Sequence, residues 1–146
     1  MALLRGRNIR LVLCGLRAFS FVFTGLVLAA PAGGPPDRVS AGIWGGQGIG
    51  MEVTGKGATL EYDCAHGTVD EVMLLDSAGH FEVRGTHVRE HPGPVHEGET
   101  NGRPALYSGK VNGDTLTLTV RLAGTDETVG TFTLVLGKPA RIRRCG

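Results

Sequence analysis

The sequence predicts an all-β protein, an antiparallel up-and-down meander of eight or nine short strands that closes into a small barrel. Three observations support this prediction. Apolar and polar residues alternate with a period of two in several windows, glycine-containing turn sequences separate these windows, and no window carries the apolar stripe of an amphipathic helix. A two-sheet β-sandwich is the alternative. We favour the barrel because closure leaves no strand edge unpaired.

Residues 1–32 are predicted to be a secretory signal that lies outside the fold. Four arginines precede or flank a run of 13 apolar or small residues, Ala18–Ala30, and Ala30-Pro31-Ala32 offers small residues to a signal peptidase. The alternative is an uncleaved membrane anchor, but spanning a bilayer takes about 20 apolar residues. We therefore expect cleavage after Ala32 and a secreted or periplasmic protein without membrane contact.

Cleavage at this position leaves one domain, in which residues 33–40 are a Pro/Gly-rich leader and residues 41–146 form the barrel. The signal takes four of the 15 Lys and Arg residues with it, so 11 remain against 14 Asp and Glu, a formal net charge of −3. A mildly acidic domain has no electrostatic basis for general nucleic-acid binding. We expect no nucleic-acid partner.

The cysteines that remain after cleavage are Cys64 and Cys145, because Cys14 belongs to the signal. Two cysteines in an exported chain predict one disulfide. A pair of free buried thiols is the alternative.

The strands follow from the alternation and from the turns between them. In "DTLTLTVRLAG", Leu116, Leu118 and Val120 share one face and threonines share the other. Asn112-Gly113-Asp114 precedes this window and is a strong hairpin signal. The predicted strands cover residues 41–45, 48–54, 57–64, 71–76, 80–89, 104–111, 114–123, 128–136 and 140–145. The residues expected inside the barrel are Trp44, Leu60, Leu116, Leu118, Phe132 and Leu134.

The tripeptide Gly42-Ile43-Trp44 opens the first predicted strand as G-x-W. It resembles the first-strand signature of the lipocalin and avidin superfamily. The resemblance implies that Trp44 closes one barrel end and that Arg144 or Arg141 packs over its ring, a cation–π contact worth about 0.5–2 kcal/mol. A Cys64–Cys145 bridge between the tail and an early strand is also similar to many lipocalins. The second and third lipocalin motifs and the tryptophans of the avidin biotin pocket are absent.

The segment "GTHVREHP" contains His87, Glu90 and His91 in the H-x-x-E-H order of the inverted zinc proteases. The alternation upstream of it, with Phe81 and Val83 on the His87 face, predicts a strand instead. On a strand His87 and His91 lie about 13 Å apart, too far to bind one metal ion. We therefore predict neither a zinc-protease site nor any other cofactor.

Two weaker chemical hypotheses concern the loops. His91 and His96, with nearby glutamates, could form a metal site in the 90–103 loop, although such a composition is equally typical of a solvated loop. His66 lies near Asp70 and Glu71, which suggests an acid/base group. Residues of this kind more often cap a turn.

The expected function is that of an exported, non-enzymatic module that binds a small polar ligand at the barrel mouth. An eight-stranded barrel has room for packed side chains or for one small ligand. Loops 65–71 and 90–103 are expected to line the mouth with His66, Glu90, His91 and Arg103. The alternatives are a metal-assisted hydrolase that uses the loop histidines and a structural or interaction protein with a packed interior.

Overall fold

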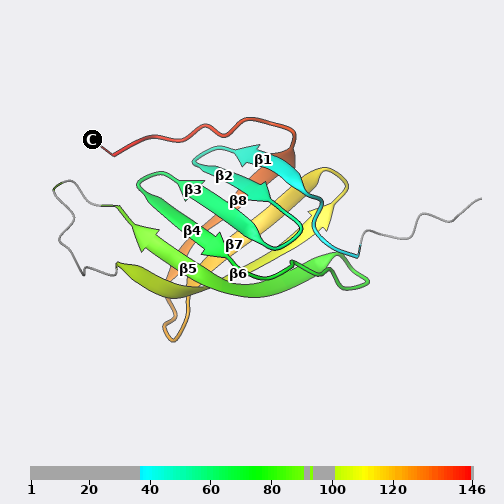
Figure 1. Ribbon diagram of the computed structural model, residues 1–146, viewed down its shortest axis with the longest axis horizontal. Coiled ribbons are helices and arrows are strands. Elements are labelled where there is room, and N and C mark those ends of the chain that lie inside the picture. Colours follow the sequence, from blue (N-terminus) through cyan, green and yellow to red (C-terminus); the bar gives the residue numbers. More distant parts are fainter. Residues whose placement is uncertain (1–36, 91–92, 94–100, 146) are drawn as a thin grey trace, which may run out of the picture. The chain divides into compact units, whose positions relative to one another are not determined.

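The computed structural model describes residues 37–90, 93 and 101–145, which form an eight-stranded antiparallel barrel (Figure 1). Each strand pairs with the next one in the chain, and β8 pairs back with β1. The predicted all-β meander and its closure are confirmed, and the sandwich alternative is excluded. The strands are β1 (Gly42–Gly46), β2 (Ile49–Val53), β3 (Ala58–Tyr62), β4 (Ala65–Val69), β5 (His80–Arg89), β6 (Gly102–Asn112), β7 (Thr115–Leu122) and β8 (Thr128–Leu136).

The predicted strand over residues 57–64 corresponds to β3, which ends two residues earlier, at Tyr62. A two-residue turn, Asp63 and Cys64, joins β3 to β4, so the expectation of a loop over residues 65–71 is wrong, because β4 occupies most of that segment. Cys64 adopts a φ of 61°, in the left-handed region that glycine and asparagine favour. Because cysteine is not a typical turn residue, the sequence does not mark this turn.

Two other predicted strands are absent. Residues 71–76 belong to the connection between β4 and β5, where a single bridge joins Arg38 to Leu74. Residues 140–145 contribute one parallel bridge, Gln47 to Arg141, rather than a strand. Among the described residues no helix is long and apolar enough to cross a membrane.

The barrel interior is filled by the apolar face of each strand. Leu116, Leu118 and Val120 of β7 are completely buried, whereas the threonines between them lie on the outer face. Of the residues predicted to be inside, Phe132 is partly buried against the core. The others are buried: Trp44, Leu60, Leu116, Leu118 and Leu134.

Trp44 is completely buried, and its indole N–H donates a hydrogen bond to Ser40 O at 2.9 Å. Arg141 and Arg144 are exposed near the C-terminus. The interactions among the described residues include no cation–π contact between either arginine and Trp44. The packing implied by the lipocalin resemblance stays a prediction.

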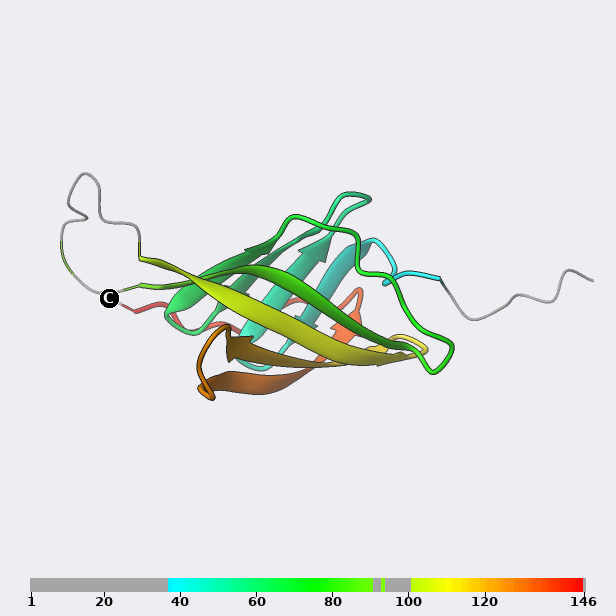
Figure 2. The same cartoon turned by 90° about the horizontal axis from the view of Figure 1, so that it is seen from below.

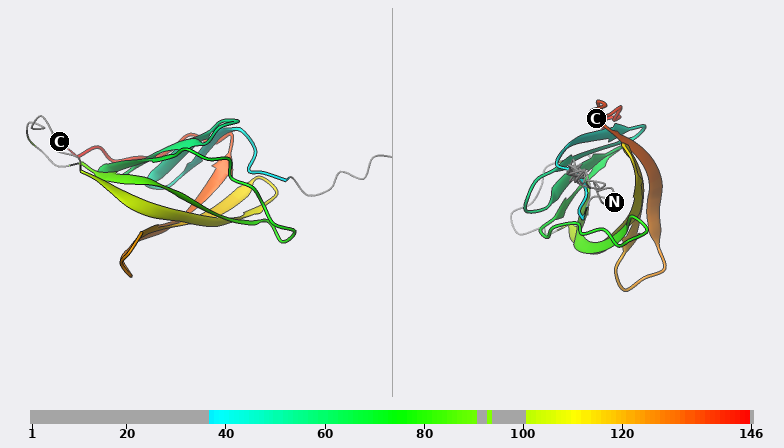
Figure 3. Two further views of the ribbon diagram at one scale, coloured as in Figure 1. Left: turned by 60° about the horizontal axis from the view of Figure 1, so that its bottom comes forward. Right: turned by 90° about the vertical axis from the view of Figure 1, so that its right-hand side faces the viewer.

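The connections between strands alternate between the two barrel ends, as the meander requires (Figure 1, Figure 2). We call one end the mouth. It carries the β1–β2 turn, the β3–β4 turn, the end of β5, the beginning of β6 and the β7–β8 hairpin tip. The hairpin tip at residues 123–127 extends away from the other strands (Figure 3).

The chain after β8, residues 137–145, crosses the outside of β1 and β2 and ends at the β3–β4 turn (Figure 1). We call this segment the strap. Arg141 N donates to Gly46 O at 3.0 Å, and Gly48 N donates to Arg141 O at 2.8 Å. The Cys64–Cys145 disulfide holds its end, with Cα atoms 5.1 Å apart, so the predicted bridge is confirmed.

The strap lies close to the barrel because the outer face beneath it carries glycines. Gly45 and Gly50 are directly opposite each other across the β1–β2 pair. A Cβ atom at Gly45 would lie 2.7 Å from Ala140 N, and one at Gly50 would lie 2.7 Å from Ala140 Cβ. Both positions therefore need to lack a side chain for the strap to pack against the sheet.

Candidate ligand site at the barrel mouth

A recess of about 390 Å³ opens at the mouth. This volume falls in the range of about 300–1,000 Å³ that is usual for small-molecule sites. Its lining comes from the β1–β2 turn, the β3–β4 turn, the end of β5 and the beginning of β8. The lining includes Gln47, Tyr62, Asp63, His87, Arg89, Val129 and Phe132.

The recess exists because barrel closure is incomplete at this end. β1 and β8 pair over three residue pairs, from Trp44 opposite Leu136 to Gly46 opposite Leu134. β8 continues to Thr128 alongside β7, with a register shift between Val120 and Arg121. The first half of β8 thus has no β1 residues paired to it, and the space between it and the β1–β2 turn leads into the barrel.

Three rings from three strands meet at the inner side of the recess. Tyr62 ends β3, His87 is the inward-facing polar residue of β5, and Phe132 lies on β8. The Tyr62 ring lies 5.5 Å from the His87 ring at an interplanar angle of 65°, and 5.6 Å from the Phe132 ring at 44°. These are favourable edge and tilted geometries for aromatic pairs.

Tyr62 and His87 each bury a polar atom that makes no hydrogen bond with any described residue, the Tyr62 hydroxyl and His87 Nδ1. Tyr107, by contrast, donates its hydroxyl hydrogen to Thr86 O at 2.7 Å. The Tyr107 hydroxyl lies close enough to raise the Tyr62 pKa through its charge and through a side-chain hydrogen-bond interaction, but the two hydroxyls do not meet at the geometry of a full hydrogen bond. Leaving a buried polar group unpaired costs about 1–3 kcal/mol.

Burial keeps these groups neutral at physiological pH. It raises the pKa of the Tyr62 hydroxyl far above its usual value, with a further contribution from Tyr107, and it raises the Tyr107 pKa as well. Burial lowers the pKa of His87, and the positive charge of Arg89 lowers it further. The recess therefore presents a neutral phenol and a neutral imidazole, each able to form hydrogen bonds.

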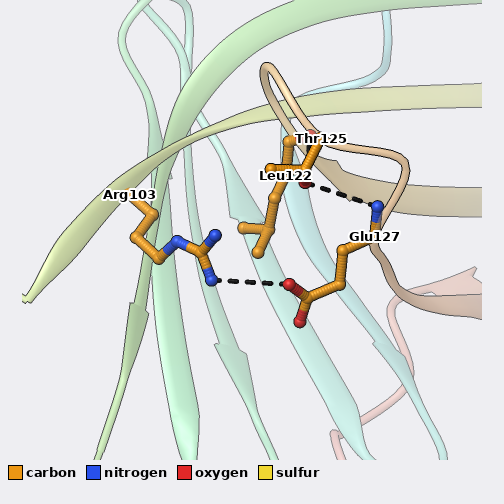
Figure 4. A network of polar contacts seen from close by, with 4 residues as sticks. All are labelled: Arg103, Leu122, Thr125 and Glu127. Atoms are coloured by element: carbon orange, nitrogen blue, oxygen red, sulfur yellow. Dashed lines mark hydrogen bonds and ion pairs between the residues drawn. The ribbon is translucent and has the colours of Figure 1, made fainter.

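Most of the charged groups around the mouth take part in ion pairs or hydrogen bonds. Arg103 N–H donates to Glu127 Oε2 at 3.5 Å, and the Glu127 backbone N–H donates to Thr125 Oγ1 at 3.3 Å (Figure 4). Asp63 Oδ1 accepts a hydrogen bond from Arg143 N at 2.6 Å. Arg89 is exposed at the rim and forms no ion pair within residues 37–90 and 101–145.

The structure places three of the sequence-predicted ligand residues, His66, Glu90 and Arg103, around the recess rather than in it. His66 and Glu90 meet at 3.2 Å, but both are exposed, and they line a groove between the strap and the outer face of β3 and β4. Arg103 lies at the rim, paired with Glu127. His91 and His96, the metal candidates, lie outside the described residues.

The acid/base group suggested for His66, Asp70 and Glu71 does not assemble. His66 pairs with Glu90, whereas Glu71 Oε1 accepts a hydrogen bond from Arg84 N at 2.8 Å. The part of the chain that the structure describes contains no group of three or more His, Cys, Asp or Glu side chains placed to hold a metal ion.

Sequence reasoning did not identify Tyr62, Arg89 or Phe132 as site residues. Tyr62 and Phe132 alternate with polar residues and were indistinguishable from core positions. Of the recess residues, His87 could have been identified from the sequence, because a histidine on the apolar face of a predicted strand places a polar group inside the barrel. No protein-family model, curated protein or solved structure matches the chain.

Replacing Tyr62 with phenylalanine should raise the free energy of unfolding by about 1 kcal/mol, because it removes a buried hydroxyl that has no hydrogen-bond partner in the part of the chain that the structure describes. The matched control is Tyr107→Phe, which removes a hydroxyl that donates to Thr86 O. That variant should lose about 1 kcal/mol. Urea unfolding measures both. Equal destabilisation by the two substitutions would show that the Tyr62 hydroxyl is paired in solution.

Protein stability should fall as the pH decreases below about 6.5, the ordinary histidine pKa. The unfolded chain binds a proton there that folded His87 resists, because its pKa is lowered. The unfolded state then holds more protons than the native state, so stability rises with pH through this window and is fully present above it. His87→Gln should reduce this slope in urea unfolding measured between pH 5 and 7.5. An unchanged slope would contradict the assignment.

Proposed function

We propose that this protein is an exported, non-enzymatic barrel that binds one small polar ligand at its mouth. The observation that carries the proposal is the presence of two buried polar groups without hydrogen-bond partners among the described residues, the Tyr62 hydroxyl and His87 Nδ1, on side chains that line one recess. A ligand that hydrogen-bonds to both removes the cost of leaving them unpaired. Such groups stay in a binding site because they select the ligand, although they destabilise the empty protein.

Export is supported by the signal-like sequence of residues 1–32 and by the disulfide, since such bridges persist in oxidising compartments. We also propose distant membership of the lipocalin and avidin superfamily. The closed eight-stranded meander and the buried Trp44 of the G-x-W tripeptide support this membership. Fold likeness alone does not determine function.

A structural protein with a packed interior is the second candidate. Its support is the filling of the barrel beyond the recess by completely or almost completely buried large side chains, among them Trp44, Tyr107, Ile49 and Leu60. A metal-assisted hydrolase remains the third hypothesis. It depends on His91 and His96, for which the structure offers no description.

Native mass spectrometry of protein purified from its own host tests the proposal. We expect one small organic molecule per chain, lost on denaturation, and not retained by a Tyr62→Phe, His87→Phe double variant that is still folded by circular dichroism. A chain without any bound molecule, together with no thermal shift from a panel of small polar compounds, would favour the packed structural barrel. A rise in melting temperature with zinc, manganese or calcium that disappears in a His91→Ala, His96→Ala variant would favour the hydrolase.

A further inference from the structure

The pairing of the charged groups at the mouth bears on the ligand. Three nearby acidic groups already have partners: Glu127 contacts Arg103, Glu90 contacts His66, and Asp63 accepts a hydrogen bond from a strap backbone N–H. The Arg89 guanidinium has no such partner among the described residues. Among the described residues that line the recess, Arg89 is therefore the cation with which a negative group of a ligand can pair, while Asp63 keeps its own negative charge.

The place of Arg89 on β5 determines where it lies relative to the buried polar groups. It follows His87 by two residues on β5, so both side chains leave the same face of the strand. Arg89 is paired across the sheet with the inward-facing Ala65, which places it at the inner rim. Two residues of strand span about 7 Å. A ligand that reaches both His87 and Arg89 therefore has polar groups at opposite ends of a body about one ring long.

The surfaces between these ends suit a flat apolar body. Phe132 and Tyr62 present tilted rings 5.6 Å apart, and Val129 adds an aliphatic side chain at the opening. Aromatic rings pack against each other with offset or edge-on contacts, which these walls offer. An aliphatic chain fits less well, since polar atoms of Tyr62 and His87 lie at the inner end of the recess.

We propose that the recess binds a small aromatic carboxylate with a second polar group at the far end of its ring. The carboxylate pairs with the Arg89 guanidinium, the ring packs against Tyr62 and Phe132, and the second polar group meets the Tyr62 hydroxyl and His87 Nδ1. A planar guanidinium binds a carboxylate through two parallel hydrogen bonds, which gives direction as well as affinity. This inference rests on the proposed function and specifies its ligand class.

Isothermal titration with 4-hydroxybenzoate and its neutral analogue 4-hydroxybenzamide tests the ligand class. The two probes share ring and hydroxyl and differ in charge. We expect the carboxylate to bind at least tenfold more tightly than the amide, and this advantage to shrink as salt is raised, because the rim charge is exposed. Arg89→Gln should reduce the advantage to less than threefold, because the variant loses more affinity for the carboxylate than for the amide.

Arg84→Gln is the matched control, because Arg84 lies on the same strand but is exposed on the outer face. It should leave both affinities unchanged.

Equal binding of amide and carboxylate in the wild-type protein would overturn the aromatic-carboxylate inference and leave the proposed mouth site standing. Carboxylate binding that is unaffected by both Arg89→Gln and Tyr62→Phe would place the ligand elsewhere and overturn it too. No binding of either probe at millimolar concentration would overturn the ligand class, and absence of any co-purifying molecule would overturn the proposed function.

Discussion

The double substitution Cys64→Ser, Cys145→Ser should lower the free energy of unfolding by about 4 kcal/mol. The bridge joins residues 81 positions apart, and removing a cross-link of this length frees the unfolded chain by roughly that amount. The strap also loses its terminal anchor, although its hydrogen bonds with Gly46 and Gly48 remain. Urea unfolding under non-oxidising conditions measures the loss, and wild-type protein reduced with dithiothreitol should give the same value.

A second variant separates the cross-link from the local backbone. Cys64 adopts a φ of 61°, which costs a residue with a side chain about 1–2 kcal/mol. Cys64→Gly, Cys145→Ser should therefore be more stable than the double serine variant by about 1 kcal/mol, since glycine adopts this conformation without a steric penalty. A loss below 1 kcal/mol in the double serine variant would contradict the cross-link argument.

Much of the fold could be predicted because alternation determines which face of each strand is buried. The predicted ranges 80–89 and 128–136 coincide with β5 and β8. The failures lie where a turn has no turn residue, as at Cys64, or where apolar residues pack without a ladder, as in the connection that contains Met73. Neither feature leaves a periodic signal in the sequence.

The site was harder to predict because its residues are far apart in the chain. Tyr62, His87 and Phe132 lie on β3, β5 and β8, and they meet through barrel closure and the precise register of the pairs. Alternation indicates that each side chain faces inward, but it does not indicate that all three lie at the same level along the barrel axis. The missed β3–β4 turn mattered most, since it places Tyr62 at the mouth rather than within a longer strand.

The outer face of β1 yields the second large prediction, which concerns Gly45. A Cβ atom there would lie against three backbone atoms of the strap: Lys138 O, Pro139 C at 2.5 Å and Ala140 N at 2.7 Å. Backbone atoms cannot rotate away, so Gly45→Ala requires the strap to lift from the sheet. The strap is held by Gly137 N donating to Ile43 O at 2.7 Å and by the disulfide. We expect a loss of about 3 kcal/mol, at the upper end for overpacking.

The cost of Gly45→Ala should depend on whether the strap is free to move. In the Cys64→Ser, Cys145→Ser background the strap has one free end, so the same substitution should cost about 1 kcal/mol, a coupling energy of about 2 kcal/mol. Gly55→Ala is the control, because a Cβ atom at Gly55 meets no other atom within 4 Å. It should change stability by less than about 0.5 kcal/mol in both backgrounds. Equal losses for Gly45→Ala with and without the disulfide would mean that the sheet, rather than the strap, absorbs the added methyl group.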